Sequence, residues 1–366
     1  MPAAGPTSAP EAPAAPAPAP VPALLPPATT SGAVTADPRF GPPDTIPQFA
    51  QDVAARDKLD AAWIESVLAQ AVFLPDIRPL MVPPSARGFG NWRAYRARFV
   101  DPIRINAGVR FWQRNRDTLA RAQAEFGVPP EIIVGILGVE TVYGRNMGSF
   151  RVLDTLSTLA FDFPREHPRA AARQAYFRNE LAQFLLLCVR NGLDPADAVG
   201  SYAGAMGIPQ FMPSSWLRYA IDFEGDGHVD LWDNETDAIG SVANYFKEHG
   251  WQPGEPTHFS VTLAPGADLD ALLAPDITPT FSAAQFQAMG ADLSAAGRGY
   301  GGPLALIRLT NGNPARPGHA PSYVAGTQNF YVVTRYNHSA FYAMSVIDLG
   351  EQIAKALRQR EATASE

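Results

Sequence analysis

The sequence has one cysteine, little charge and no long apolar run. Because Cys188 is alone, the chain cannot form an internal disulfide or a zinc or iron–sulfur site built from cysteines. Charged residues are only 18% of the 366, and the formal net charge is -7. That balance is unfavourable for a protein that tracks nucleic-acid phosphates, so nucleic acid is not an expected partner. No stretch of about 18 or more apolar residues is present, so we expect no transmembrane segment.

Proline and alanine dominate residues 1–45, which carry few charges and one aromatic residue, Phe40. This composition favours extended conformations and buries too little surface to repay ordering, so we predict a disordered tether. Neither a signal peptide nor a lipid-acceptor cysteine is visible in it. Tethers of this kind are common in exported bacterial proteins, which favours a periplasmic or cell-envelope location. The alternative is a cytosolic protein with a disordered tail.

Apolar residues recurring every three or four positions predict a mainly α (α+β) protein. Apolar and polar residues alternate over 257–263 and 303–309, as is typical of β-strands, and the pattern over 331–336 also indicates an extended segment. The domains we expect are a helical N-terminal lobe (46–125), a helical core (126–252), a small inserted mixed α/β lobe (253–325), a return segment that completes the core (326–358) and a tail (359–366).

Glu140 lies in the most apolar helix that the sequence predicts, over 131–143. Burial disfavours the charged form of a carboxyl group and raises its pKa, so Glu140 could hold a proton near neutral pH and act as a general acid. The alternative is a structural glutamate paired with an arginine or with backbone donors. Glu140 stands in the last turn before Gly144, and such helix ends often open onto a cleft, which favours the acid.

A glycine-rich segment over 200–216 reads Gly-Ser-Tyr-Ala-Gly-Ala-Met-Gly-Ile-Pro-Gln-Phe-Met-Pro-Ser-Ser-Trp. Its small residues allow a ligand to approach the backbone, and Ser201 and Gln210 offer neutral hydrogen bonds. This suits a sugar better than a phosphate, because the Lys-Ser/Thr pair of a phosphate loop is missing. Taken alone, the segment also fits a tight connection between two helices.

These two segments, with Val242-Ala243-Asn244-Tyr245-Phe246 and Tyr336-Asn337-His338-Ser339, resemble the membrane-bound lytic transglycosylase B family of bacterial murein-cleaving enzymes. The resemblance covers about 46–357. It implies a lysozyme-like helical core, peptidoglycan glycan strands as substrate, no catalytic cofactor, and wall-synthesis or division proteins as further partners. It also implies Glu140 as the single catalytic acid/base, with glycan contacts from Ser201, Gln210, Tyr245, Tyr336, Asn337, Tyr342, Arg173 and Tyr176.

The implied reaction breaks the bond between N-acetylmuramic acid and N-acetylglucosamine without water and leaves a 1,6-anhydro end. Two other functions stay open. A lysozyme-like muramidase would use the same groove but admit water, and its product would be heavier by one water. A non-catalytic glycan-binding protein of the envelope would keep Glu140 ion-paired and closed off.

Residues 222–233 have acidic side chains at loop positions 1, 3, 5, 9 and 12 and glycine at position 6, the spacing of an EF-hand calcium loop. We therefore expect a structural Ca²⁺, although Glu224 and Asp233 depart from the usual residues at positions 3 and 12. A solvated acidic turn is the alternative, and a calcium sensor is less favoured because there is one such loop. The expected ligands are the side chains of Asp222, Glu224, Asp226 and Asp233, the backbone carbonyl of His228, and Asp230 through water.

Overall fold

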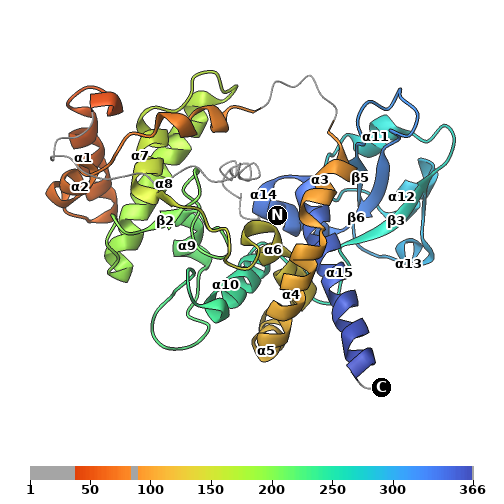
Figure 1. Ribbon diagram of the computed structural model, residues 1–366. Helices are drawn as coiled ribbons and strands as arrows, with labels where there is room; N and C mark the ends of the chain where they lie inside the picture. The colour runs from red at the N-terminus through yellow and green to blue at the C-terminus, as the bar shows by residue number, and fades with distance from the viewer. Residues whose placement is uncertain (1–37, 84–89, 365–366) are drawn as a thin grey trace, which may run out of the picture.

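The computed structural model describes residues 38–83 and 90–364 and is mainly helical, with one small sheet-containing lobe (Figure 1). The predicted fold class is confirmed. Most of the predicted tether lies outside the described residues, but its end at Phe40 is buried. The helices are α1 (Thr45–Asp57), α2 (Ala61–Leu68), α3 (Trp92–Phe99), α4 (Pro102–Arg114), α5 (Arg116–Phe126), α6 (Pro130–Thr141), α7 (Val152–Phe161), α8 (Ala170–Asn191), α9 (Pro213–Tyr219), α10 (Glu235–Glu248), α11 (Leu269–Leu273), α12 (Ala283–Ala288), α13 (Ala295–Arg298), α14 (Gln328–Asn337) and α15 (Ala340–Ala364).

Helix α6 lies at the centre, against α4, α5, α10 and α15. Its contact with α15 is close enough to require glycine on both helices. A Cβ on Gly135 would clash with the carbonyl of Val346, and one on Gly350 would clash with the carbonyl of Glu131. Because α15 covers α6 in this way, the last described helix completes the core around Glu140.

Both ends of α6 follow from local sequence. Gly127, in the left-handed region at φ 72°, ends α5, and Pro129 and Pro130 begin α6, where a missing N–H carries no penalty. At the other end, Val142 (φ 52°) and Tyr143 (φ 60°) are also left-handed. The helix therefore stops directly after Thr141, and Glu140 is held in its final turn.

The residues 46–125 do not form one lobe. Helices α1 and α2 lie beside α7 and α8 (Figure 1), where the rings of Phe49 and Phe161 meet edge to face at 5.5 Å. The N–H of Val72 donates to the Asp154 carboxylate at 2.8 Å. Helices α3, α4 and α5 instead pack on α6, α10 and α15. The first helices thus extend the α7–α8 pair, and the later ones belong to the central bundle.

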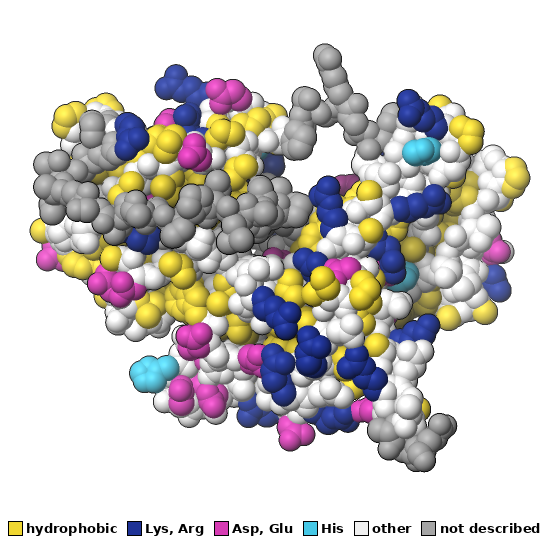
Figure 2. All heavy atoms as spheres, in the orientation of Figure 1, with side chains coloured by type: hydrophobic (Ala, Val, Ile, Leu, Met, Phe, Trp, Pro, Cys, Tyr) yellow, Lys and Arg dark blue, Asp and Glu magenta, His cyan; other side chains and the backbone are white. Residues whose placement is uncertain are grey.

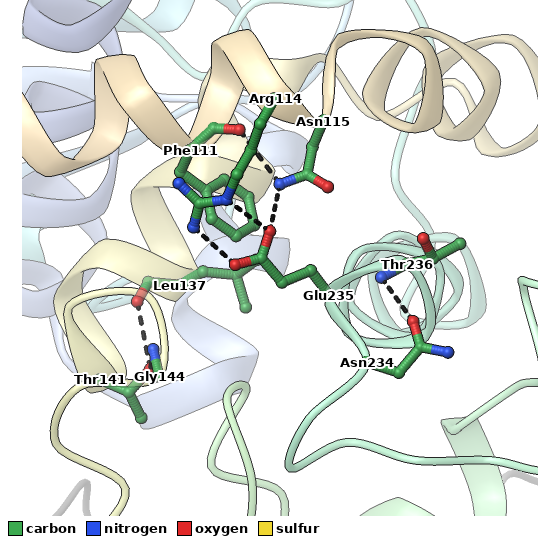
Figure 3. Close-up of polar contacts among 9 residues, drawn as sticks. All are labelled: Phe111, Arg114, Asn115, Leu137, Thr141, Gly144, Asn234, Glu235 and Thr236. Carbon is green, nitrogen blue, oxygen red and sulfur yellow. Dashed lines mark hydrogen bonds and ion pairs between the residues drawn. The ribbon is translucent and has the colours of Figure 1, made fainter.

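One polar cluster ties α10 to the junction of α4 and α5 (Figure 3). Glu235, the first residue of α10, accepts from the guanidinium of Arg114 (Nε, 2.9 Å) and from the side chain of Asn115. Asn115 also separates α4 from α5 and bonds back to the carbonyl of Phe111 at 3.1 Å. The start of α10 is fixed by these contacts.

The small lobe is inserted between α10 and α14 and has its own apolar core, which includes Leu272, Phe286 and Leu306. Its four strands are antiparallel in the order β4-β3-β6-β5. The predictions for 257–263 and 303–309 are confirmed by β3 and β5. The strands of the molecule are β1 (Phe150–Arg151), β2 (Val199–Gly200), β3 (His258–Leu263), β4 (Ala291–Leu293), β5 (Ala305–Leu309) and β6 (Ser322–Gly326), and 3-10 turns lie at Pro38–Phe40, Pro75–Ile77 and Pro79–Met81.

One expectation for the return segment and one for the residues after it are wrong. Residues 331–336, expected to be extended, lie within α14, which begins where the Thr327 hydroxyl accepts from the N–H of Asn329 at 3.1 Å. The β-forming residues there are buried on a helical face, so tertiary packing decides against their intrinsic preference. The tail expected from 359 is also helical, because α15 continues to Ala364.

Candidate active site

Glu140 is half-buried at the end of α6, whereas residues 132–139 before it are buried. Its Oε1 accepts a hydrogen bond of 2.5 Å from the Tyr342 hydroxyl of α15. Burial raises the pKa of Glu140 to about 7, and the Tyr342 hydrogen bond opposes this by stabilising the carboxylate. In residues 38–83 and 90–364 no arginine, lysine or histidine forms an ion pair with it. In this environment the carboxyl group keeps its proton to a higher pH than it would in water.

Tyrosines surround this carboxyl group. The rings of Tyr336 and Tyr342 are stacked, with centroids 6.3 Å apart. Burial, and next the Glu140 charge, raise the pKa of Tyr342 well above its usual value, so Tyr342 remains a hydrogen-bond donor. The same two causes raise the pKa of Tyr95 in α3 to about 12. Tyr95 was not found by sequence reasoning, since no motif marks it.

The group of tyrosines continues to Tyr245, whose ring lies 4.8 Å from that of Tyr336. The hydroxyls of both residues donate to backbone carbonyls, from Tyr336 to Pro209 at 2.7 Å and from Tyr245 to Arg335 at 2.9 Å. These polar tips therefore tie α14 to α10 and to the glycine-rich segment. Asn337, also expected here, is buried at the end of α14.

The glycine-rich segment folds on itself around its predicted polar residues. The Ser201 hydroxyl accepts from the N–H groups of Ala203 (3.3 Å) and Ala205 (3.0 Å), so it closes the turn. Gln210 has a left-handed backbone, φ 54°, and its side-chain Nε2 donates to the carbonyls of Met147 (3.1 Å) and Gly207 (3.0 Å). These two hydrogen bonds hold the side-chain amide of Gln210 in place and occupy its NH₂ donor group.

Arg173 in α8 is 3% exposed, and its guanidinium makes no hydrogen bond within the described residues. It lies over the rings of Tyr176 and Phe177, each 4.9 Å from the guanidinium carbon. Burial lowers the pKa of Arg173. Tyr176 hydrogen-bonds to Glu180 and is close enough to Tyr245 for each to affect the other's ionisation. The structure therefore links α8 to the tyrosines beside Glu140.

The acidic loop lies on the surface between α9 and α10, where Figure 2 shows acidic side chains gathered. Asp222 accepts from its own loop, including the N–H of Gly225 at 2.5 Å and that of Gly227 at 2.7 Å. The donor types and spacing fit a calcium ion, but across the described chain no three acidic, histidine or cysteine side chains converge on one point. Sequence reasoning missed Asp237, a buried α10 carboxylate that accepts from three N–H groups of this loop.

None of the helices described is long and apolar enough to cross a membrane.

Comparison with known proteins identifies the class. The family model described as the transglycosylase SLT domain matches residues 43–351. The chain therefore belongs to this family and is a lytic transglycosylase.

Similar proteins come from two bacteria. Membrane-bound lytic murein transglycosylase B of Escherichia coli K12 is 41% identical over 326 residues, which cover 84% of this chain and 82% of that protein. The crystal structure of soluble lytic transglycosylase SltB1 from Pseudomonas aeruginosa is 40% identical, with TM-score 0.75, covering 85% of this chain and 98% of that one. A structure of E. coli Slt35 in complex with calcium is 41% identical, with TM-score 0.72, covering 85% and 93%.

Proposed function

We propose that this lytic transglycosylase cleaves the β-1,4 bond between N-acetylmuramic acid and N-acetylglucosamine in peptidoglycan, with Glu140 as its only acid and base. The observation that carries the proposal is the environment of Glu140. Its pKa is raised to about 7 by burial, and among the described residues its side-chain hydrogen-bond partner is the neutral donor Tyr342. No second carboxylate of the described residues influences that pKa, whereas most glycosidases use two carboxyl groups.

Tyr342 determines which Glu140 oxygen holds the proton. Its hydroxyl occupies Oε1, so a proton on the neutral acid is carried by Oε2. That proton passes to the bridging oxygen as the bond from this oxygen to C1 of the muramic residue breaks. Positive charge develops at C1, where the substrate's own acetamido oxygen can stabilise it.

The same group then acts as a base. The Glu140 carboxylate removes the proton of the C6 hydroxyl while O6 bonds to C1, which gives the 1,6-anhydro ring and restores the neutral acid. No water is consumed. A hydroxyl held within the same sugar has a very high effective concentration, so it can react ahead of solvent.

The proposed glycan contacts come from α8, α10, α14 and α15 and from the glycine-rich segment. Tyr176 and Tyr336 are half-buried and offer apolar surface to pyranose rings. Tyr245 and Tyr342 are buried and pack against Tyr336. Ser201, Gln210 and Asn337 supply neutral polar groups beside them. We propose that Arg173 binds a negatively charged group of the substrate, because its buried guanidinium has no hydrogen-bond partner in the described chain.

Digestion of purified peptidoglycan sacculi tests the reaction. The protein is expected to release muropeptides lighter by one water than hydrolytic products, and Glu140→Gln is expected to release none while still binding sacculi. Products with a reducing end would instead identify a muramidase. Turnover by the Glu140→Gln variant would refute the role of Glu140.

We further propose a structural Ca²⁺ in the acidic loop, held by the side chains of Asp222, Glu224, Asp226 and Asp233 and by the His228 carbonyl. Support comes from the EF-hand spacing and from the calcium complex of the E. coli relative. The ion would neutralise closely spaced carboxylates and has no part in the chemical steps. A periplasmic or envelope location, with wall-synthesis or division proteins as partners, is the setting that fits a murein substrate.

A further inference from the structure

The aromatic rings beside Glu140 do not end at Tyr245. The ring of His249, which directly follows α10, stacks on the Tyr245 ring with centroids 4.0 Å apart and planes at 25°. Tyr219, the last residue of α9, meets the Tyr245 ring edge to face at 4.9 Å and lies 5.0 Å from the His249 ring. Tyr219 and His249 are both half-buried and are outside the glycan contacts proposed above. We call these two residues the distal pair.

The distal pair continues a row of rings that begins at the acid. Tyr342 donates to Glu140, and its ring is stacked 6.3 Å from that of Tyr336. The Tyr336 ring lies 4.8 Å from that of Tyr245, and the distal pair packs on Tyr245. Tyr336 and the distal pair are half-buried, whereas Tyr245 and Tyr342 are buried. Along this row the distal pair therefore adds partly exposed aromatic surface one ring further from Glu140 than Tyr245.

Both members of the distal pair are held by hydrogen bonds to backbone. The Nδ1 atom of His249 lies 2.7 Å from the carbonyl oxygen of Tyr245. A carbonyl only accepts, so Nδ1 carries the proton, and Nε2 of the neutral ring is an acceptor. The side-chain amide of Asn244 donates to the carbonyl of Tyr219 at 3.0 Å, which fixes the end of α9 on α10. Rings that are already ordered bind a ligand at a low cost in conformational entropy.

Other aromatic residues fill the core beneath this row. Phe211 and Phe246 are buried and lie 6.0 Å and 5.9 Å from the Tyr336 ring. Trp251 is also buried and packs on Phe246 at 5.8 Å. The distal pair lies outside this buried layer, because both of its side chains keep part of their surface exposed. A flat ring with a polar edge suits a pyranose, which has an apolar face and hydroxyl groups around it.

We propose that the distal pair is a further saccharide subsite of the same glycan groove. The proposal rests on the proposed function, because a strand with its scissile bond at Glu140 must extend along the row of rings to reach the pair. A sugar remote from that bond stacks on the rings and donates a hydroxyl hydrogen bond to Nε2 of His249. The competing ligand is a carboxylate of the peptide stem, since the guanidinium carbon of Arg218 lies 5.3 Å from the centre of the Tyr219 ring.

The length of the bound glycan tests the subsite. Oligomers of N-acetylglucosamine, from two to six units, carry no peptide and are titrated calorimetrically into the Glu140→Gln variant. Adding His249→Ala is expected to leave the affinity for the two-unit oligomer unchanged, because that oligomer is too short to need the distal pair. The affinity for the six-unit oligomer should fall by about three- to tenfold, the value of one hydrogen bond with its stacked ring.

A histidine in the small lobe provides the matched control. The Nδ1 atom of His319 lies 2.6 Å from the carbonyl oxygen of Asn311, the same kind of contact that His249 makes. His319 is also half-buried. His319→Ala therefore removes an equivalent side chain and should leave the affinity for every oligomer unchanged.

Tyr219 supplies a second test, which stands if His249→Ala does not fold. Tyr219→Phe keeps the aromatic ring and should bind the six-unit oligomer like the parent. Tyr219→Leu removes the ring and should lose affinity for the six-unit oligomer only.

Three results would overturn the subsite. Equal losses for short and long oligomers would mean that the distal pair only supports Tyr245. An unchanged affinity for the six-unit oligomer would mean that no sugar reaches the pair. A loss for peptide-bearing muropeptides but not for the oligomers would identify a peptide contact beside Arg218. The reaction is decided separately, by the product mass and by Glu140→Gln on sacculi, and His249→Ala should still release 1,6-anhydro ends.

Discussion

The Tyr342 hydroxyl and the Glu140 carboxylate are 202 residues apart in the chain and 2.5 Å apart in the structure. The hydrogen bond favours the charged form of Glu140, and burial favours the neutral form. The two effects together leave the pKa of the acid near the pH at which it must work. The proposed catalytic function of Glu140 therefore depends on a contact between α6 and α15 rather than on any local motif.

Replacing Tyr342 by phenylalanine is expected to raise the pKa of Glu140 above 7. Activity requires the protonated acid, so the alkaline limb of the pH profile of kcat/KM, near pH 7 in the parent protein, moves upward. A hydrogen bond to a charged group is worth about 1.5 kcal/mol or more, which corresponds to roughly one pH unit. The pH–rate profile of each variant measures the shift. Tyr323→Phe in the small lobe is the control, and an unmoved limb in Tyr342→Phe would contradict the prediction.

The Glu140→Gln variant is expected to be more stable than the parent protein above pH 7. The folded-state pKa of Glu140 is raised from 4.5 to about 7, so below pH 4.5 both states hold the proton and no penalty applies. As pH rises through this window the unfolded state loses its proton first, and the folded protein loses stability, by roughly 2 kcal/mol for this half-buried group. Glutamine does not titrate. Melting temperatures at pH 5 and pH 8 are the measurement, and an equal difference at both pH values would argue against a raised pKa.

Arg173→Met is expected to weaken substrate binding without destabilising the fold. A buried arginine whose nitrogens lack hydrogen bonds pays a desolvation penalty that methionine avoids, so the melting temperature should stay level or rise. Binding to an acidic muropeptide, measured in the inactive Glu140→Gln background, should weaken by about tenfold or more, since a charged hydrogen bond is lost. Arg173→Lys keeps the charge and should bind with intermediate strength. Unchanged binding together with a lower melting temperature would give Arg173 a structural role instead.

Calcium is expected to raise the melting temperature of the protein, because the ion binds the folded loop and not the unfolded chain. Scanning calorimetry with calcium and with a chelator measures the difference. Asp222→Asn should abolish it, and Asp270→Asn, an exposed change in α11, should not. A melting temperature that is the same with calcium and with chelator would exclude the ion.

How much of the fold could be predicted from the sequence differs from one element to the next. The start of α6 was recoverable because Gly127 and the prolines after it act through their own backbone geometry. Its end was predicted at 143 instead of Thr141, because Val142 and Tyr143 adopt left-handed backbones that their residue types do not indicate. The helix over 331–336 was mistaken for an extended segment because its β-branched residues are buried only in the tertiary structure. The division of 46–125 between two regions also depends on long-range contacts, such as that of Phe49 with Phe161.

The residues of the candidate site were likewise predictable only where the sequence itself marks them. Glu140 was visible in the sequence because a lone carboxylate in an apolar helix is unusual whatever its partners. Tyr95 and Asp237 were not, since each gains its role from groups that lie far away or are part of the backbone. The Asp237 carboxylate accepts from N–H groups of the acidic loop, and backbone donors leave no trace in residue identity.

The glycine-mediated crossing of α6 and α15 has a consequence for the order of assembly. Helix α15 follows every other described element, so the surface that covers α6 and the hydroxyl that touches Glu140 leave the ribosome after all of those elements. A nascent chain that has been translated only through the small lobe contains the acid but not the surroundings that keep it protonated. An enzyme that cuts the load-bearing polymer of a cell would in this way stay inert until α15 has been translated.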